Sequence, residues 1–120
     1  MADDMKTAID AFYIKRMEDV RGILGEARKL KEERKDYRSE ILRAKELLDV
    51  PVWRFAELLA EGGLYEDAGE VAEKSGCYLQ ASRHYRQADD RIGEERCLKK
   101  DASIRQLAMI TNGFNDYKQI

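Results

Sequence analysis

The sequence predicts an all-α protein, in which a long helical hairpin is followed by short, stacked antiparallel helices. Charged residues make up 38% of the chain and hydrophobic residues 43%, and Ala, Leu, Glu, Lys and Arg are plentiful. This composition favours helices. Apolar residues recur at steps of three and four, which is the period of a helix. With 120 residues, a single domain 1–120 is expected.

The first part of the chain, 4–49, predicts the hairpin. Asp3, Asp4 and Thr7 suit a helix start, because carboxylates and side-chain oxygens stabilise free amides there. The first helix is expected to run from about residue 4 to the mid-thirties, with an end or kink near Lys35 and Asp36. A second helix should end before Pro51, the only proline. Its apolar stripe is Ile41, Leu42, Ala44, Leu47 and Leu48.

Segment 50–111 carries a repeat of 13 residues. Gly63, Tyr65, Ala68 and Ala72 are echoed by Gly76, Tyr78, Ala81 and Tyr85. The spacing predicts units of about ten helical residues and turns of about three, with breaks at Gly63, Gly76 and Asp89. The repeated Tyr and Ala positions share a helix face and are expected to point inward.

The end of the repeat is less regular. In the unit from Asp89, Arg91 and Glu94 replace Tyr and Ala, whereas Ile92 and Cys97 are apolar out of phase, so either this helix is rotated or the repeat has decayed. The last unit, from Ala102, is expected to stop at the turn pair Asn112 and Gly113, before a tail 112–120.

This pattern, G-x-Y-x-x-A-x-x-x-A/Y, resembles the short-helix units of tetratricopeptide-like and SNAP-like α-solenoids over residues 50–101. The resemblance implies a helical scaffold that binds protein segments. It identifies no residue of a binding site.

The sequence contains no pattern that predicts a catalytic, cofactor or metal site, so we expect no enzyme activity and no cofactor. His84 is the single histidine, and the residues one helical turn away are Gln80, Ala81, Gln87 and Ala88, none a carboxylate or thiol. Cys77 and Cys97 are expected to be packed, reduced thiols.

The densest basic group lies in segment 28–38, where carboxylates interrupt it. The formal net charge is −2, which argues against nucleic-acid binding by bulk electrostatics. A salt-bridged, solvated helix is the preferred interpretation of this segment. A nucleic-acid-associated helical protein that uses segment 28–38 is the chief alternative function.

We therefore expect a protein-binding adaptor or assembly module, with a protein partner of unknown identity. Self-association is also open, because a long first helix in a short chain can need a second copy to cover its stripe. The sequence holds no run of about 18 apolar residues for a membrane span, and a cytoplasmic location is expected. Trp53 most simply pins the hairpin to the short helices and is alternatively a partner anchor. The other candidate partner-binding residues are Arg83, Arg86 and Gln87.

Overall fold

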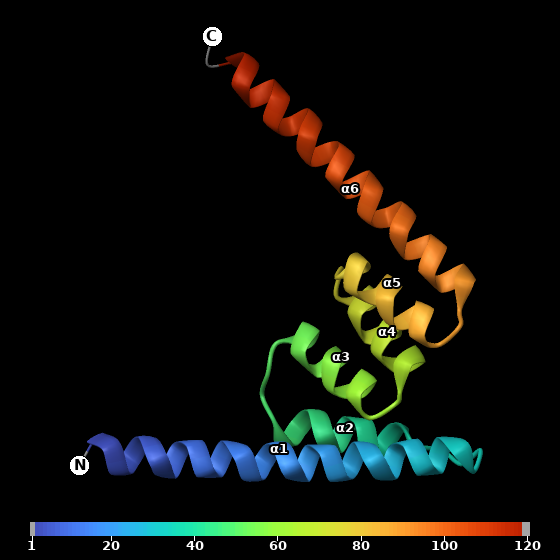
Figure 1. Cartoon of the computed structure of the whole chain (residues 1–120). Helices are drawn as coiled ribbons and strands as arrows, with labels where there is room; N and C mark the ends of the chain where they lie inside the picture. The colour runs from blue at the N-terminus through green and yellow to red at the C-terminus, as the bar shows by residue number, and fades with distance from the viewer. Residues whose placement is uncertain (1, 119–120) are drawn as a thin grey trace. The chain divides into compact units, whose positions relative to one another are not determined.

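A computed structural model describes residues 2–118 of the chain, with side chains for 8–110 (Figure 1). The described residues form helices and no strand, which confirms the predicted all-α class. The chain divides into two compact units, Met1–Leu64 and Tyr65–Ile120, and each is described by itself. The helices are α1 (Ala2–Glu32), α2 (Arg38–Leu47), α3 (Val52–Glu61), α4 (Tyr65–Lys74), α5 (Tyr78–Gln87) and α6 (Arg91–Lys118).

In the first unit, α1 and α2 pack together as the predicted helical hairpin (Figure 1). The apolar stripe of α1 is buried from Met17 to Ala27, and Val20 and Ala27 are fully buried. Ala44 of α2 is fully buried as well, and this small side chain permits close approach of the two helices. The first unit's core is thus built on the C-terminal half of α1.

The helix α3 completes this core. Pro51 precedes α3 with an extended backbone, φ −55° and ψ 149°, and its carbonyl accepts hydrogen bonds from the amides of Arg54 and Phe55 at 3.0 and 3.1 Å. Proline suits this position because it has no amide of its own to satisfy and has a φ angle compatible with a helix start. The buried face of α3 consists of Phe55, Ala56, Leu58 and Leu59.

The 13-residue repeat appears directly in the helix boundaries. The helices α3, α4 and α5 are each ten residues long and begin at Val52, Tyr65 and Tyr78, and α6 begins in the same register at Arg91. The expected ten helical residues and three-residue turns are therefore present at α3, α4 and α5, but not in the later units.

The three turns share one hydrogen-bonded conformation. Gly63, Gly76 and Asp89 all have left-handed backbones, with φ of 82°, 81° and 59°. After each of them, the next amide donates back across the last helical turn, in the Schellman arrangement that satisfies free carbonyls. These bonds are Leu64 N to Leu59 O, Cys77 N to Ala72 O and Asp90 N to Tyr85 O, each 2.9 Å.

In the second unit, α5 packs against both α4 and α6. Ala68, Ala72 and Ala81 are fully buried and Tyr85 is 3% exposed, as the repeat predicted. Tyr65 and Tyr78 are only partly buried, so the expectation of inward-facing positions holds for the alanines and Tyr85 but not fully for these two tyrosines.

The last helix departs from the sequence prediction. It is one continuous helix, Arg91–Lys118, so the expected break at Ala102 is absent and the predicted stop at Asn112 and Gly113 is wrong. Ala102 is a strong helix former and Gly inside a helix costs only about 1 kcal/mol, too little to force an end. The expected tail 112–120 is therefore helical to Lys118, and 119–120 lie outside the described residues.

The irregular unit from Asp89 is a rotated helix. Gly93 and Cys97 face the core of the second unit, whereas Ile92 is 77% exposed. Of the two out-of-phase apolar residues, only Cys97 therefore contributes to packing.

Candidate functional site

The N-terminal part of α1, which we call the α1 arm (residues 8–16), carries large apolar side chains that this chain leaves exposed. By helical spacing, Ile9 and Tyr13 continue the stripe that is buried at Val20 and Leu24. Phe12 is 60% exposed, and the guanidinium of Arg16 lies 4.9 Å from the centre of its ring. The arm thus extends a helix-packing surface beyond the part that α2 and α3 cover.

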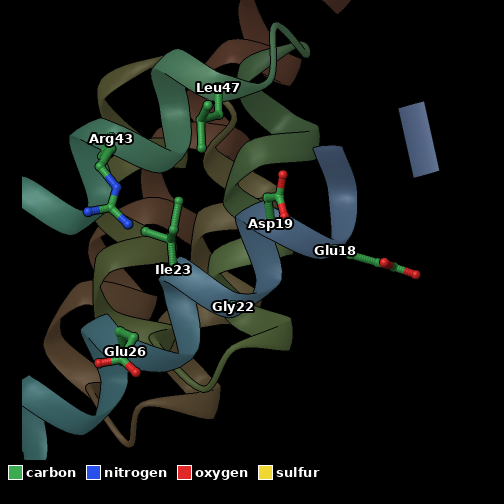
Figure 2. Close-up of a pocket in the computed structure, with 7 residues that line it drawn as sticks. All are labelled: Glu18, Asp19, Gly22, Ile23, Glu26, Arg43 and Leu47. Carbon is green, nitrogen blue, oxygen red and sulfur yellow. The ribbon is translucent and has the colours of Figure 1, made fainter. Parts of the chain in front are cut away.

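Next to the arm, α1 and α2 enclose a shallow hollow of about 510 Å³, which we call the α1–α2 groove (Figure 2). Its apolar surface comes from Ile23 of α1 and Leu47 of α2, and Gly22 leaves the backbone of α1 uncovered there. In Figure 2, Ile23 points toward α2, while the side chain of Glu18 points away from the other labelled residues. The groove is lined by Glu18, Asp19, Gly22, Ile23, Glu26, Arg43 and Leu47.

A second, smaller hollow of about 210 Å³ lies along the same helix. It is lined by Phe12, Lys15, Arg16 and Asp19, so it shares Asp19 with the α1–α2 groove. The two hollows therefore form one interrupted face of α1, with cations toward its N-terminal end and carboxylates toward its C-terminal end.

The other long helix also has an exposed apolar segment. The α6 segment (residues 99–110) extends past the residues that pack on α5, and its large side chains are exposed; Leu107, for example, is 64% exposed. Its exposed apolar side chains are Ile104, Leu107, Met109 and Ile110.

The candidate partner-binding residues on α5 lie at the surface. Arg83, Arg86 and Gln87 are all exposed, but two of them make contacts within the chain. Arg86 forms an ion pair with Glu94 at 2.8 Å, and Gln87 Oε1 lies 3.0 Å from Nδ1 of the buried His84. Trp53, in the first turn of α3, is 51% exposed. The role of these residues stays a prediction.

A polar cluster inside the second unit was not anticipated from the sequence. The carboxylate of Glu73 in α4 accepts a hydrogen bond from the Tyr85 hydroxyl at 2.8 Å and two from the Arg96 guanidinium at 2.7 and 2.8 Å. The Tyr85 ring fits against Gly69 and Gly93, where an added Cβ would lie 2.9 and 2.8 Å from ring atoms. The only sequence signal for this contact was a glycine inside each of two helices.

Electrostatics within this cluster favour the ionised carboxylate. The hydrogen bonds from Arg96, reinforced by that from Tyr85, lower the pKa of Glu73 to about 2 despite its partial burial. Burial, with the neighbouring Glu73 carboxylate, raises the pKa of the Tyr85 hydroxyl. The cluster ties α4, α5 and α6 together and leaves the carboxylate with its partners satisfied, which is typical of a structural ion pair.

The remaining polar candidates are packed or paired. Burial raises the pKa of the Cys97 thiol, which makes it a poor nucleophile. In the part of the chain that the structure describes, no group of three or more His, Cys, Asp or Glu side chains is arranged to hold a metal ion.

The basic segment 28–38 contains ion pairs with its interleaved carboxylates. Arg28 pairs with Glu32 at 3.3 Å, and Lys35 pairs with Glu33 at 3.2 Å. Phosphate binding would compete with these carboxylates, so the arrangement gives the nucleic-acid alternative no support.

With this geometry in view, comparison with protein-family models, with curated proteins and with solved structures finds no significant match to the chain. Within the described residues, no helix is both long and apolar enough to cross a membrane. The exposed surfaces of the two long helices are therefore the best guide to function.

Proposed function

We propose that this protein is a non-catalytic assembly module that binds other protein segments through the exposed apolar faces of its long helices. The observation that carries the proposal is the α1 arm, where Ile9, Phe12 and Tyr13 extend a buried helical stripe into solvent. Contiguous exposed apolar surface of this kind is characteristic of protein interaction sites. An amphipathic helix is the natural partner, because the same stripe already packs against helices within the first unit.

In this proposal, the short helices serve as the scaffold that holds the long helices. Three ten-residue helices end in the same left-handed turn at Gly63, Gly76 and Asp89, a local pattern that resembles the short-helix units of tetratricopeptide-like α-solenoids. In the second unit, α5 packs against both α4 and α6, and contacts of this kind between neighbouring helices stabilise a helical repeat. In this proposal the short helices of each unit support its own long helix, and the protein acts in the cytoplasm.

The proposal can be tested by affinity capture from the native cell with the full chain as bait. Phe12→Glu and Leu107→Glu each place a charge on one of the two exposed apolar segments, and Ile92→Glu is the matched control at an exposed apolar residue outside both. We expect at least one of the first two variants to lose partners that the wild-type and Ile92→Glu proteins retain, because a buried charge without a partner is costly. Identical captured proteins with all four baits would contradict the proposal.

A second measurement separates this function from the nucleic-acid alternative. Binding that depends on apolar contacts should survive a rise in salt, whereas binding to phosphates weakens steeply. We expect the captured partner to remain bound when the salt concentration is raised severalfold, and capture that disappears with salt or nuclease treatment would favour the alternative.

A further inference from the structure

One face of α1 is complementary to itself when two copies run antiparallel. Its residues follow alternating steps of four and three, which place them on one side of a helix. All of them are exposed, and Lys15 lies toward the N-terminal end of the face, with Asp19 toward the C-terminal end. The face consists of Ala8, Phe12, Lys15, Asp19, Gly22 and Glu26.

Two independent features of this face select the same antiparallel register. With a twofold axis near Met17, Lys15 of each copy lies opposite Asp19 of the other, and opposite charges at facing positions favour this pairing. The same axis places Phe12 of each copy opposite Gly22 of the other. A parallel arrangement would instead set each charge beside its identical counterpart. The sequence of the face therefore matches a second copy of itself.

The structure provides room for this contact. Apart from Gly22, its two chain neighbours and the nearby backbone of α1, no atom lies within 4 Å of the position that a Cβ on Gly22 would occupy, so an aromatic ring can rest directly on the helix backbone. The α1–α2 groove of about 510 Å³ surrounds this point, with Ile23 and Leu47 as apolar walls (Figure 2). Phe12 itself is exposed, and the hollow that it lines within its own chain is the smaller one of about 210 Å³.

The charges needed for pairing are also free to pair. Among residues 8–110, whose side chains the structure describes, neither Lys15 nor Asp19 takes part in an ion pair. Pairing between two copies would therefore break no salt bridge that the monomer possesses.

We propose that the protein forms a symmetric homodimer in which two α1 helices pair antiparallel, with Phe12 of each copy seated over Gly22 in the α1–α2 groove of the other. This inference rests on the proposed assembly function and names its partner as a second copy of this chain. Because the face is short, the contact is smaller than a standard stable interface, and a dissociation constant in the range of about 10 to 100 µM is expected.

The first test compares two glycines of α1. Sedimentation velocity of the full chain at rising concentration should show a monomer–dimer equilibrium. In Gly22→Gln, the new side chain occupies the space in which Phe12 of the other copy would pack, so the dissociation constant should rise by about tenfold or more. Gly25→Gln is the matched control, because Gly25 is also exposed and has no neighbouring side chain within 4 Å of a Cβ position, but lies outside the pairing face; it should leave dimerisation unchanged. Both variants replace Gly by a better helix former, so neither should lose thermal stability.

The second test exchanges the paired charges. Lys15→Asp and Asp19→Lys each set like charges opposite one another and should weaken dimerisation by about tenfold, because two contacts change per dimer. The double variant Lys15→Asp with Asp19→Lys restores both pairs and should recover the wild-type dissociation constant. Failure of the double variant to recover dimerisation lost by the single variants would overturn the register.

A third comparison separates failure of this dimer from failure of the general function. A wild-type chain that stays monomeric to about 500 µM, or a dimer lost on Leu107→Glu and kept on Phe12→Glu, overturns the α1 pairing. If Phe12→Glu then still abolishes capture of another protein, the assembly function stands without the homodimer. If neither dimerisation nor capture responds to Phe12→Glu, both the pairing and the use of the α1 arm are wrong.

Discussion

The hydroxyl of Tyr85 donates a 2.8 Å hydrogen bond to the carboxylate of Glu73, which lies one helix earlier in the second unit. The same carboxylate receives a bidentate pair of hydrogen bonds from Arg96 on the next helix. One buried ring and one carboxylate thus connect three successive helices, and the stability of the second unit should depend on both groups.

Removal of the Tyr85 hydroxyl should weaken the second unit. In Tyr85→Phe the ring packing remains, but Glu73 loses one donor, and a hydrogen bond to a charged group contributes about 1.5 to 3 kcal/mol. We expect the free energy of unfolding in urea to fall by about 1 to 2 kcal/mol. Tyr78→Phe is the control: Lys100 lies over the Tyr78 ring, and this contact does not need the hydroxyl. Equal losses in the two variants would argue against the importance of the Glu73 bond.

The depressed pKa of Glu73 predicts a specific dependence of stability on pH. Because its pKa is about 2 in the folded protein and 4.5 for the unperturbed group, ionised Glu73 contributes stability that is fully present above about pH 4.5. That contribution is lost as the pH falls from 4.5 toward 2. In urea titrations at several pH values, the wild-type protein should therefore lose more stability over this interval than Glu73→Gln, whose side chain does not titrate. Parallel curves for the two proteins would contradict the prediction.

Substitution by Ala at a glycine that faces Tyr85 should destabilise the protein, whereas the same substitution at a surface glycine should stabilise it. Gly93→Ala would place a methyl group 2.8 Å from the Tyr85 ring, and overpacking of this kind costs about 1 to 3 kcal/mol. Gly25→Ala in α1 meets no atom within 4 Å and should gain about 0.5 to 1 kcal/mol from helix propensity alone. Thermal unfolding of both variants checks the contrast, and stabilisation by Gly93→Ala would show that the ring can move away at little cost.

Local backbone requirements explain what could be predicted of the fold. The turns at Gly63, Gly76 and Asp89 need left-handed backbones, which Gly and Asp adopt more readily than most residues. One Gly or Asp at each turn meets this requirement, so the 13-residue spacing of the helices could be predicted from the sequence. The continuation of α6 past Ala102 could not be predicted in this way, because the 13-residue spacing suggested a break there although no residue enforces one.

The candidate sites were less predictable because they depend on contacts between distant residues. Glu73 and Arg96 lie 23 positions apart, and no periodic pattern links them. The groove beside Gly22 depends on where α2 places Leu47 against α1, which the stripe of α1 does not specify. The hydrophobic period could show that α1 has an apolar face, but only the packed hairpin shows that this face is covered from Met17 to Ala27 and uncovered at Phe12.

The left-handed turns lead to a final prediction on the repeat itself. Gly76 has a φ of 81° and no atom within 4 Å of the position that a Cβ would occupy, so Gly76→Ala would strain the backbone without a steric clash. We expect a loss of about 1 kcal/mol in the free energy of unfolding, because a left-handed conformation costs about 1 to 2 kcal/mol for a residue with a Cβ.

Arg34, which follows α1 with a φ of 59°, already bears this cost, so Arg34→Gly should be neutral or stabilising by up to about 0.5 kcal/mol. Urea denaturation of the two variants tests the pair, and a stable Gly76→Ala protein would mean that this turn can change its conformation without disturbing the packing of α4 on α5.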